Sequence, residues 1–317
     1  METPTTLQEA IQHYSNYENC MAYMVAKRWP KGVTCPACGS AHVVYMENVR
    51  RWKCYGKHER PQFSLKTGTI FEDSPLGLDK WLPVMWLLAN CKNGISSWEI
   101  HRDLKVTQKT AWFMLQRARL ATQDPETGGK LGGEVEVDET FIGAKARNMH
   151  KDVKERKLQG RTGGTQGKAI VAAVLERGGT VRAKVVDKRK KKDLQALVRD
   201  HVEPGSALYS DSLKSYDGLS DEYAHQVVDH AVAYVDGQVH TNNCENFWSL
   251  LKRGLKGTYV SVEPLHLFRY VDEQAFRYNN RKLTDAERFD NVMGQIVGKR
   301  LTYKELIGTA EESSSLN

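Results

Sequence analysis

The sequence predicts a protein of the α/β class with several segments, and three observations support this class. Between residues 134 and 290, apolar runs typical of strands alternate with stretches that have helical spacing. Upstream, the pair Cys35 and Cys38 favours a small metal-bound ribbon, and the chain then becomes helical. We therefore expect five segments: an N-terminal helix with the ribbon (1–75), a helical segment (76–123), a Gly-rich linker (124–133), the α/β domain (134–290) and a C-terminal tail (291–317).

The overall charge favours an acidic polymer as partner. The chain has 317 residues, a formal charge of +7 and a pI of about 8.9. Basic residues gather in two runs, 145–168 and 188–192, and the second run contains Lys190; either run is also compatible with a solvated loop. The chain lacks an apolar stretch of about 20 residues and a signal-peptide pattern, so we expect a cytoplasmic protein without a membrane partner.

The N-terminal cysteines are expected to hold a structural Zn²⁺ ion. Cys35 and Cys38 are two residues apart, and Gly39 allows the backbone to turn tightly around the two thiolates. Cys54 follows, but position 57 is a lysine, so a second Cys-x2-Cys pair is not present. His58 is the nearest competent fourth ligand, with His42 as the alternative.

The next segment is predicted to contain a helix-turn-helix. Helices are expected over 79–89, over 95–104 with a serine cap, and over 106–120 with Thr107 as the cap. Two short helices joined by a tight turn, the second one polar at its start, are typical of DNA-reading motifs. Gln108, Lys109 and Arg117 would then face DNA, whereas a plain helical bundle is the alternative. Four tryptophans are expected in the core in either case: Trp81, Trp86, Trp98 and Trp112.

The order of elements after the linker predicts a ribonuclease H-like fold, with a mixed five-stranded sheet and helices. The expected order is a strand, a hairpin around Gly178–Gly179, a helix, two more strands and a last helix. The first and fourth strands of that fold are neighbours. The expected strands are 134–142, 168–177, 181–186, 207–211 and 226–228, and the expected helices are 193–202 and the one that carries Glu245.

Three acidic residues in this domain are the candidate catalytic groups. Asp138 lies within the first strand, Asp211 ends the fourth strand, and Glu245 begins the last helix. Carboxylates brought together in this way can hold two Mg²⁺ ions for phosphodiester chemistry, with Mn²⁺ as a possible substitute. Asn246 is the competing third ligand, and Glu245 is favoured because its charge neutralises the metal better.

Two cations on the last helix are expected to contact DNA. Lys252 follows Glu245 by seven residues, which is two helical turns, so both side chains project from the same face. A cation at this position would lie against the DNA backbone beside the metals, and Arg253 adjoins it.

Six motifs occur in order along the chain: Cys35-Pro36-Ala37-Cys38, residues 63–74, Val137-Asp138-Glu139-Thr140, Ser210-Asp211, residues 240–253 and residues 270–281. Together they resemble the bacterial insertion-sequence transposases of the ISXO2-like kind, which have a zinc ribbon and a DDE catalytic domain. This resemblance implies Mg²⁺-dependent DNA cleavage and strand transfer at the terminal inverted repeats, with Asp138, Asp211 and Glu245 as the catalytic acids. It also implies double-stranded DNA as partner, both repeats and target, a homo-oligomer on that DNA, and a place at the nucleoid.

Two other classes of protein explain part of the sequence. A zinc-ribbon and helix-turn-helix regulator without catalysis would explain residues 30–120 but would leave the three acids without a role. A ribonuclease H-like nuclease or resolvase would explain the acids but not the upstream segments. Strand-joining activity on paired DNA ends separates a transposase from both classes.

Overall fold

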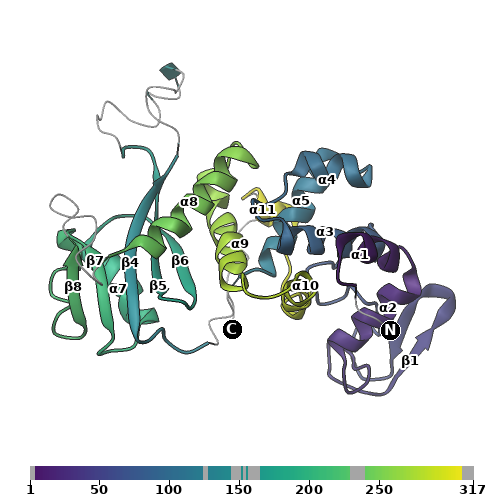
Figure 1. Cartoon of the computed structure of the whole chain (residues 1–317). Coiled ribbons are helices and arrows are strands. Elements are labelled where there is room, and N and C mark those ends of the chain that lie inside the picture. The colour runs from purple at the N-terminus through teal and green to yellow at the C-terminus, as the bar shows by residue number, and fades with distance from the viewer. Residues whose placement is uncertain are drawn as a thin grey trace. The chain divides into compact units, whose positions relative to one another are not determined.

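The computed structural model describes residues 4–123, 128–143, 151–152, 155, 165–228 and 240–308. It divides into two compact units, Met1–Gln123 with Lys282–Asn317, and Asp124–Arg281 (Figure 1). We call them unit 1 and unit 2. Within the described residues, no helix has both the length and the apolar character that a bilayer-spanning segment needs.

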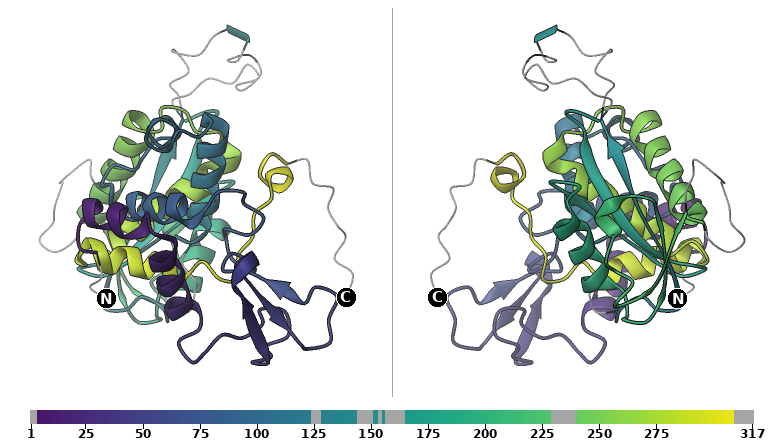
Figure 2. Two further views of the ribbon diagram at one scale, coloured as in Figure 1. Left: turned by 90° about the vertical axis from the view of Figure 1, so that its right-hand side faces the viewer. Right: turned by 90° about the vertical axis from the view of Figure 1, so that its left-hand side faces the viewer.

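Unit 1 begins with two helices and a three-stranded ribbon. The helices are α1 (Leu7–Tyr14), which has a capping box at its start, and α2 (Tyr17–Arg28). The ribbon strands pair antiparallel in the order β1-β2-β3, and Figure 2 shows them from two sides. Their bounds are β1 (Val43–Met46), β2 (Arg51–Cys54) and β3 (Gln62–Phe63), with a 3-10 turn, η1 (Glu47–Val49), between the first two.

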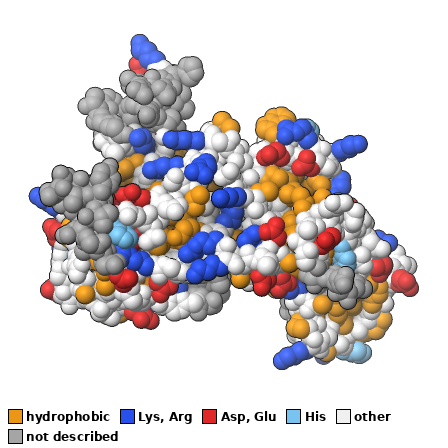
Figure 3. Space-filling view, in the orientation of Figure 1, with side chains coloured by type: hydrophobic (Ala, Val, Ile, Leu, Met, Phe, Trp, Pro, Cys, Tyr) orange, Lys and Arg blue, Asp and Glu red, His pale blue; other side chains and the backbone are white. Residues whose placement is uncertain are grey.

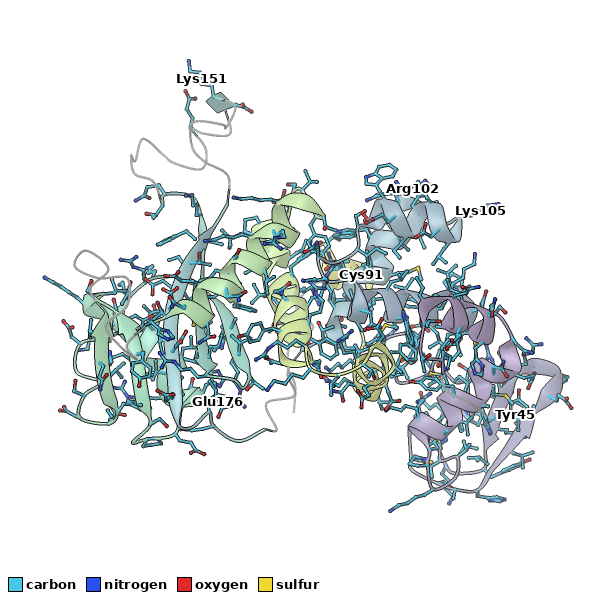
Figure 4. All side chains as sticks on the ribbon, viewed as in Figure 1. Tyr45, Cys91, Arg102, Lys105, Lys151 and Glu176 are labelled. Carbon is cyan, nitrogen blue, oxygen red and sulfur yellow. The ribbon has the colours of Figure 1, made fainter. Side chains whose placement is uncertain are left out.

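Three helices follow, with the caps that the sequence predicted. They are α3 (Leu78–Asn90), α4 (Ser97–Leu104) and α5 (Gln108–Leu120). Ser96 forms a capping box with Glu99 at the start of α4, and the Thr107 side chain accepts from the Thr110 amide at the start of α5. Lys105, in the left-handed region at φ 51°, turns the chain between α4 and α5 (Figure 4).

Two sequence-based expectations about these helices are wrong. Arg117 was expected to face DNA, but it is 4% exposed and donates a hydrogen bond to the backbone carbonyl of Glu72. Burial lowers the pKa of its guanidinium to about 10. Trp98 was expected in the core, but it is 59% exposed on α4. Both errors arise because α5 is buried over most of its second half, whereas α4 lies at the surface of unit 1.

The C-terminal segment completes unit 1. Helix α10 (Asp285–Gly294) places Phe289 against Trp86 at a ring distance of 5.1 Å, and against Tyr14 at 5.6 Å. The following residues return to the loop after the ribbon, where the Ile70 amide donates to the carbonyl of Ile296 at 3.0 Å. The expected end of the α/β domain at 290 is therefore corrected to 281, and the expected tail contains packed structure, including α11 (Tyr303–Leu306).

Unit 2 is built on a mixed five-stranded sheet, as the sequence predicted. The strand order is β6-β5-β4-β7-β8; β5 is antiparallel to β4 and β6, whereas β4, β7 and β8 are parallel. This arrangement is that of a ribonuclease H-like domain, in which the first and fourth strands are neighbours. The strands are β4 (Glu134–Ile142), β5 (Ala169–Glu176), β6 (Val181–Val186), β7 (Ala207–Asp211) and β8 (Ala224–Val228).

Helices cover both faces of this sheet. On one face, α7 (Lys191–His201) packs Leu194 and Val198 against strand residues such as Val137. On the other face, α8 (Asn242–Gly257) and α9 (Leu267–Asn279) contribute Phe247, Leu251 and other apolar residues to a second core cluster. The connection between β7 and β8 contains one short 3-10 turn, η3 (Lys214–Tyr216), and a second such turn, η4 (Pro264–His266), precedes α9.

Part of the expected linker belongs to unit 2. Leu131 is 5% exposed within the core cluster beneath α7, and its amide donates to the carbonyl of His201 at 2.7 Å. The Arg182 guanidinium donates to the carbonyls of Gly128 and Gly129. An apolar side chain in the Gly-rich stretch thus fastens residues 128–133 to the domain, while residues 124–127 lie outside the described residues.

Candidate active site

Asp138 and Asp211 lie side by side on adjacent parallel strands. The register pairs Val137 of β4 with Ser210 of β7, so each aspartate is one residue beyond that pair. Side chains alternate between the faces of a sheet, and Asp138 is opposite Ala173, which belongs to the core cluster beneath α8. Both aspartates therefore project to the face of the sheet that α8 covers.

Asp138 is a largely buried carboxylate with a fixed orientation. The indole Nε1 of Trp248 donates to its Oδ2 at 2.8 Å. The pKa of Asp138 is raised to about 7, chiefly by burial and also by the negative charges of Glu139 and Asp211, against the hydrogen bond from Trp248, which lowers it. A bound divalent cation would favour the ionised form of such a group, so this pair of carboxylates is suited to bind metal.

Helix α8 directs a polar stripe to the same place. Lys252 is half-buried, and this burial lowers the pKa of its ammonium group. The negative charge of Asp138 raises that pKa and offsets part of the effect. At about 100° per residue, Glu245 lies roughly 20° from Lys252 and 60° from Trp248 around the helix, whereas Asn246 lies roughly 160° from Trp248. The helix geometry thus favours Glu245 over Asn246 as the residue that faces the aspartates, and both side chains are exposed.

Glu136 is a fully buried carboxylate that holds the start of α8. Its oxygens accept from the backbone amides of Asn243 at 2.9 Å and Cys244 at 3.1 Å, and from Nδ2 of Asn243 at 2.8 Å. Nε of Arg177 forms an ion pair with it at 2.9 Å. Helix α8 has no side-chain cap from Thr241, its own N-cap residue, so Glu136 caps it from the neighbouring strand.

Glu136 was not predicted as a site residue, although the sequence around it contains a signal. Glu134, Glu136 and Asp138 alternate with valines along one strand, so all three share a face. Glu136 lies between two other acids on a face of the sheet that a helix covers, so its carboxylate needs cationic or amide partners. The start of α8, the helix that carries Glu245, supplies the amide partners.

Glu139 points to the opposite face of the sheet. It accepts a hydrogen bond from the Tyr216 hydroxyl at 2.9 Å and pairs with Arg189 at 3.2 Å. Burial and the charge of Asp211 raise its pKa, while Tyr216 and Arg189 lower it. Glu139 is therefore tied to the turn after β7, which follows Asp211 directly.

A second cluster of ligand atoms is present in the ribbon of unit 1. Atoms of Cys35, Cys38, Cys54 and His58 all lie within 4.8 Å of one another. Sγ of Cys35 is 3.5 Å from Nε2 of His58, and Sγ of Cys38 is 3.6 Å from Sγ of Cys54. Zinc–ligand bonds of about 2.0–2.3 Å in a tetrahedron require edges of roughly this length, so the cluster fits a structural zinc ion.

Two further features define this cluster. His42, the alternative fourth ligand, instead stacks its exposed ring on Tyr55 at a centroid distance of 4.9 Å. Gly56 lies where a side chain would collide with the ligands, because a Cβ added there would be 3.0 Å from Sγ of Cys38 and 3.3 Å from Sγ of Cys54. The need for glycine at this position was not recognised from sequence, since Gly56 does not lie in a Cys-x2-Cys knuckle.

The other residues expected to bind DNA are spread over both units. Gln108 donates to the Ser97 hydroxyl at 2.9 Å, and the ammonium of Lys109 lies 4.5 Å from the ring centre of Tyr303. Lys190 is exposed beside the start of α7, where it lines a hollow of about 520 Å³. Arg253 is exposed on α8. Most of the basic run 145–168 lies outside the described residues, and Lys168 is its last member.

Comparison with known families identifies two regions of the chain. Residues 130–279 match a family model described as the ISXO2-like transposase domain, and residues 15–56 match one described as the transposase zinc-ribbon domain. The two matched regions correspond to most of unit 2 and to α2 with most of the ribbon.

Two relatives of the chain are also informative. One is a Halobacterium salinarum protein named an uncharacterized protein in transposable element ISH50, which is 30% identical over 237 residues, 72% of this chain and 79% of that protein. The other is an uncharacterized transposase-like protein of Haemophilus influenzae, 30% identical over 91 residues, 28% of this chain and 73% of that protein.

Proposed function

The chain belongs to the family of ISXO2-like transposases, and on this basis we propose that it cleaves DNA at the inverted repeats of an insertion sequence and transfers the strand. The observation that carries this proposal is the register of Asp138 and Asp211 on neighbouring strands, beneath the helix that carries Glu245. The reaction depends on Mg²⁺, with Mn²⁺ as a substitute.

The residues divide the catalytic work as follows. Asp138 would help to hold both metals, and Asp211 and Glu245 would each hold one, because Asp211 adjoins Asp138 on the neighbouring strand and Glu245 lies near the Trp248 side of α8. When bound, two Mg²⁺ ions would activate water, and later a 3′-hydroxyl, while neutralising charge on the leaving oxygen. Lys252 binds the phosphate backbone beside the carboxylates, and Trp248 keeps Asp138 in one orientation.

Unit 1 supplies DNA recognition in this proposal. Helices α4 and α5 act as the helix-turn-helix, with Gln108 and Lys109 at the start of the second helix. The zinc ion held by the cysteines and His58 keeps the ribbon folded. The protein acts on paired DNA ends as a homo-oligomer, in the cytoplasm and at the nucleoid.

The test uses the full chain and a duplex that carries the inverted repeat flanking the gene. We expect Asp138→Asn and Asp211→Asn to abolish cleavage and joining while DNA binding stays within a few-fold, because an amide keeps the shape but lacks the charge that holds Mg²⁺. The matched control is Asp221→Asn, an exposed aspartate outside the site. Near-normal cleavage by either active-site variant contradicts the assignment, and cleavage without strand joining favours a nuclease.

A further inference from the structure

The turn that follows α8 exposes the apolar side chain of Val260 to solvent. Val260 is 79% exposed and has a φ of 60°, a left-handed conformation that β-branched residues rarely adopt. Tyr259, the residue before it, is held in place by three contacts and so fixes this conformation. The Tyr259 hydroxyl donates to Glu273 of α9, its ring packs on Tyr270 at 4.7 Å, and its amide donates to the carbonyl of Gly254 at 3.1 Å.

More apolar surface follows in the same connection between α8 and α9. Leu265 in η4 is 64% exposed, and Phe268 at the start of α9 is 37% exposed. Residues 260–268 thus contain three exposed large apolar side chains, and such a concentration is more typical of a binding surface than of a solvated loop. The strained backbone at Val260 supports this interpretation, because glycine would adopt the same conformation without strain.

A polar stripe on α8 leads from the candidate active site to this turn. Glu245, Ser249, Lys252 and Lys256 are spaced three or four residues apart, so they share one face of the helix. Lys252 interacts with Asp138, Lys168 and Lys256. Figure 3 shows Lys and Arg side chains gathered over α8. The stripe is acidic at Glu245, uncharged at Ser249 and basic at Lys252 and Lys256.

From this arrangement, and resting on the proposed function, we infer that duplex DNA runs along the stripe and that Val260 inserts into it as an apolar wedge. Charge favours DNA over a protein partner, since residues 252–269 contain four Lys and Arg residues and one acid, Glu263. The rise of a helix places Val260 about 20 Å from Glu245. This distance corresponds to roughly six base pairs from the cleaved phosphate, at 3.4 Å per base pair.

A wedge at this distance would unstack one base step and bend the duplex. Apolar side chains inserted between base pairs act in this way, and they are flanked by cations that hold the backbone. Lys256 and Arg253 are exposed on the last turns of α8 and would supply these contacts on one side of Val260. The DNA is either the element's end or the target, and both have the same chemistry.

The experiment compares the full-length protein with Val260→Gly on duplexes that carry 2-aminopurine at successive positions. Glycine removes the wedge and relieves the strain at φ 60°, so the variant is expected to fold. We expect the wild type to raise the fluorescence near the sixth base pair, and Val260→Gly to lose this rise. Val260→Leu, which keeps an apolar wedge, retains it, and Ile11→Ala, an exposed apolar residue of unit 1, behaves as the wild type.

Two duplexes separate the sources of DNA. A rise only on the duplex with the inverted repeat assigns the wedge to the element's end, and a rise on a random-sequence duplex assigns it to the target. Equal fluorescence for the wild type and Val260→Gly overturns the inference. A Val260→Gly protein that changes its oligomeric state but distorts DNA as the wild type does also overturns it, because the turn would then be a protein interface. If the wild type distorts the DNA but does not cleave it, the proposed function is contradicted, whereas the inference that Val260 acts as a wedge still holds.

Discussion

The indole of Trp248 donates a hydrogen bond to the carboxylate of Asp138, and this contact joins the middle of α8 to the central strand of the sheet, two residues along that strand from Glu136, which holds the start of α8. Trp248 is 4% exposed and packs within the core cluster beneath the helix. Its position is therefore fixed by apolar packing, and the hydrogen bond transmits that fixed position to Asp138. In the proposed role of Asp138 as a metal ligand, its orientation depends on residues that never contact the metal.

We expect Trp248→Phe to weaken cleavage by about 10–100-fold, which is typical for the loss of a partner that orients a metal ligand. Phenylalanine keeps most of the apolar packing but lacks the donor to Oδ2 of Asp138. The loss should be smaller at high Mg²⁺ concentration, and titrating cleavage against Mg²⁺ measures it. A variant with less activity but an unchanged Mg²⁺ requirement would show that Trp248 acts through packing alone.

Without Mg²⁺, the free energy of unfolding should fall as the pH rises toward neutral, because Asp138 loses its proton in that range. Its pKa is about 7 in the folded chain against an ordinary value of 3.8, so the folded state binds the proton more tightly. The stabilisation is fully present below about pH 4 and is lost as the pH rises through 7. Denaturant unfolding of the wild type and Asp138→Asn in Mg²⁺-free buffer, between about pH 5.5 and 8, isolates this contribution. Parallel pH profiles for the two proteins would contradict it.

We expect one zinc ion per chain, with Gly56 as a determinant of its binding. Cys35→Ser should lose the metal and unfold the ribbon, because small zinc domains fold on binding. Gly56→Ala should weaken zinc retention, since its Cβ presses on the sulfurs of Cys38 and Cys54. Gly129→Ala, where a Cβ meets nothing within 4 Å, is the matched control. Elemental analysis after dialysis gives the zinc content, and full zinc in His58→Ala would place the fourth ligand elsewhere.

Unit 1 should require its C-terminal segment. A fragment of residues 1–123 lacks Phe289, which is fully buried against Trp86 and Tyr14. We expect this fragment to unfold or aggregate, and Phe289→Ala to destabilise unit 1 in the full chain by about 3–5 kcal/mol. Unit 2 alone, residues 128–281, should fold. Thermal unfolding of each protein checks these outcomes, and a stable, cooperatively folded 1–123 fragment contradicts them.

The elements that sequence predicted correctly are those with local signals. The strands of unit 2 follow apolar patterns, which alternate in β4 and are continuous in β5. Helices α4 and α5 begin at the predicted caps, because a cap depends on residues three apart. The neighbouring positions of β4 and β7 followed from the order of elements.

What sequence did not predict depends on contacts between distant residues. Arg117 resembles a DNA-facing cation until α3 and the loop that contains Glu72 cover it. The return of α10 to unit 1 depends on Phe289, whose partners Trp86 and Tyr14 are more than 200 residues away in the chain. The contact between Trp248 and Asp138 was missed because Trp248 also fits the buried stripe of α8.

Because residues 282–308 complete unit 1, unit 2 is in effect inserted into it. During synthesis, the helices up to α5 leave the ribosome well before α10 does, and at about 5–20 residues per second the interval is on the order of ten seconds. The unit proposed to recognise DNA is thus finished only after unit 2, the one proposed to catalyse the reaction, has been made. A chain that terminates early would therefore lack a complete recognition unit, and it would not occupy the element's ends as an inactive competitor.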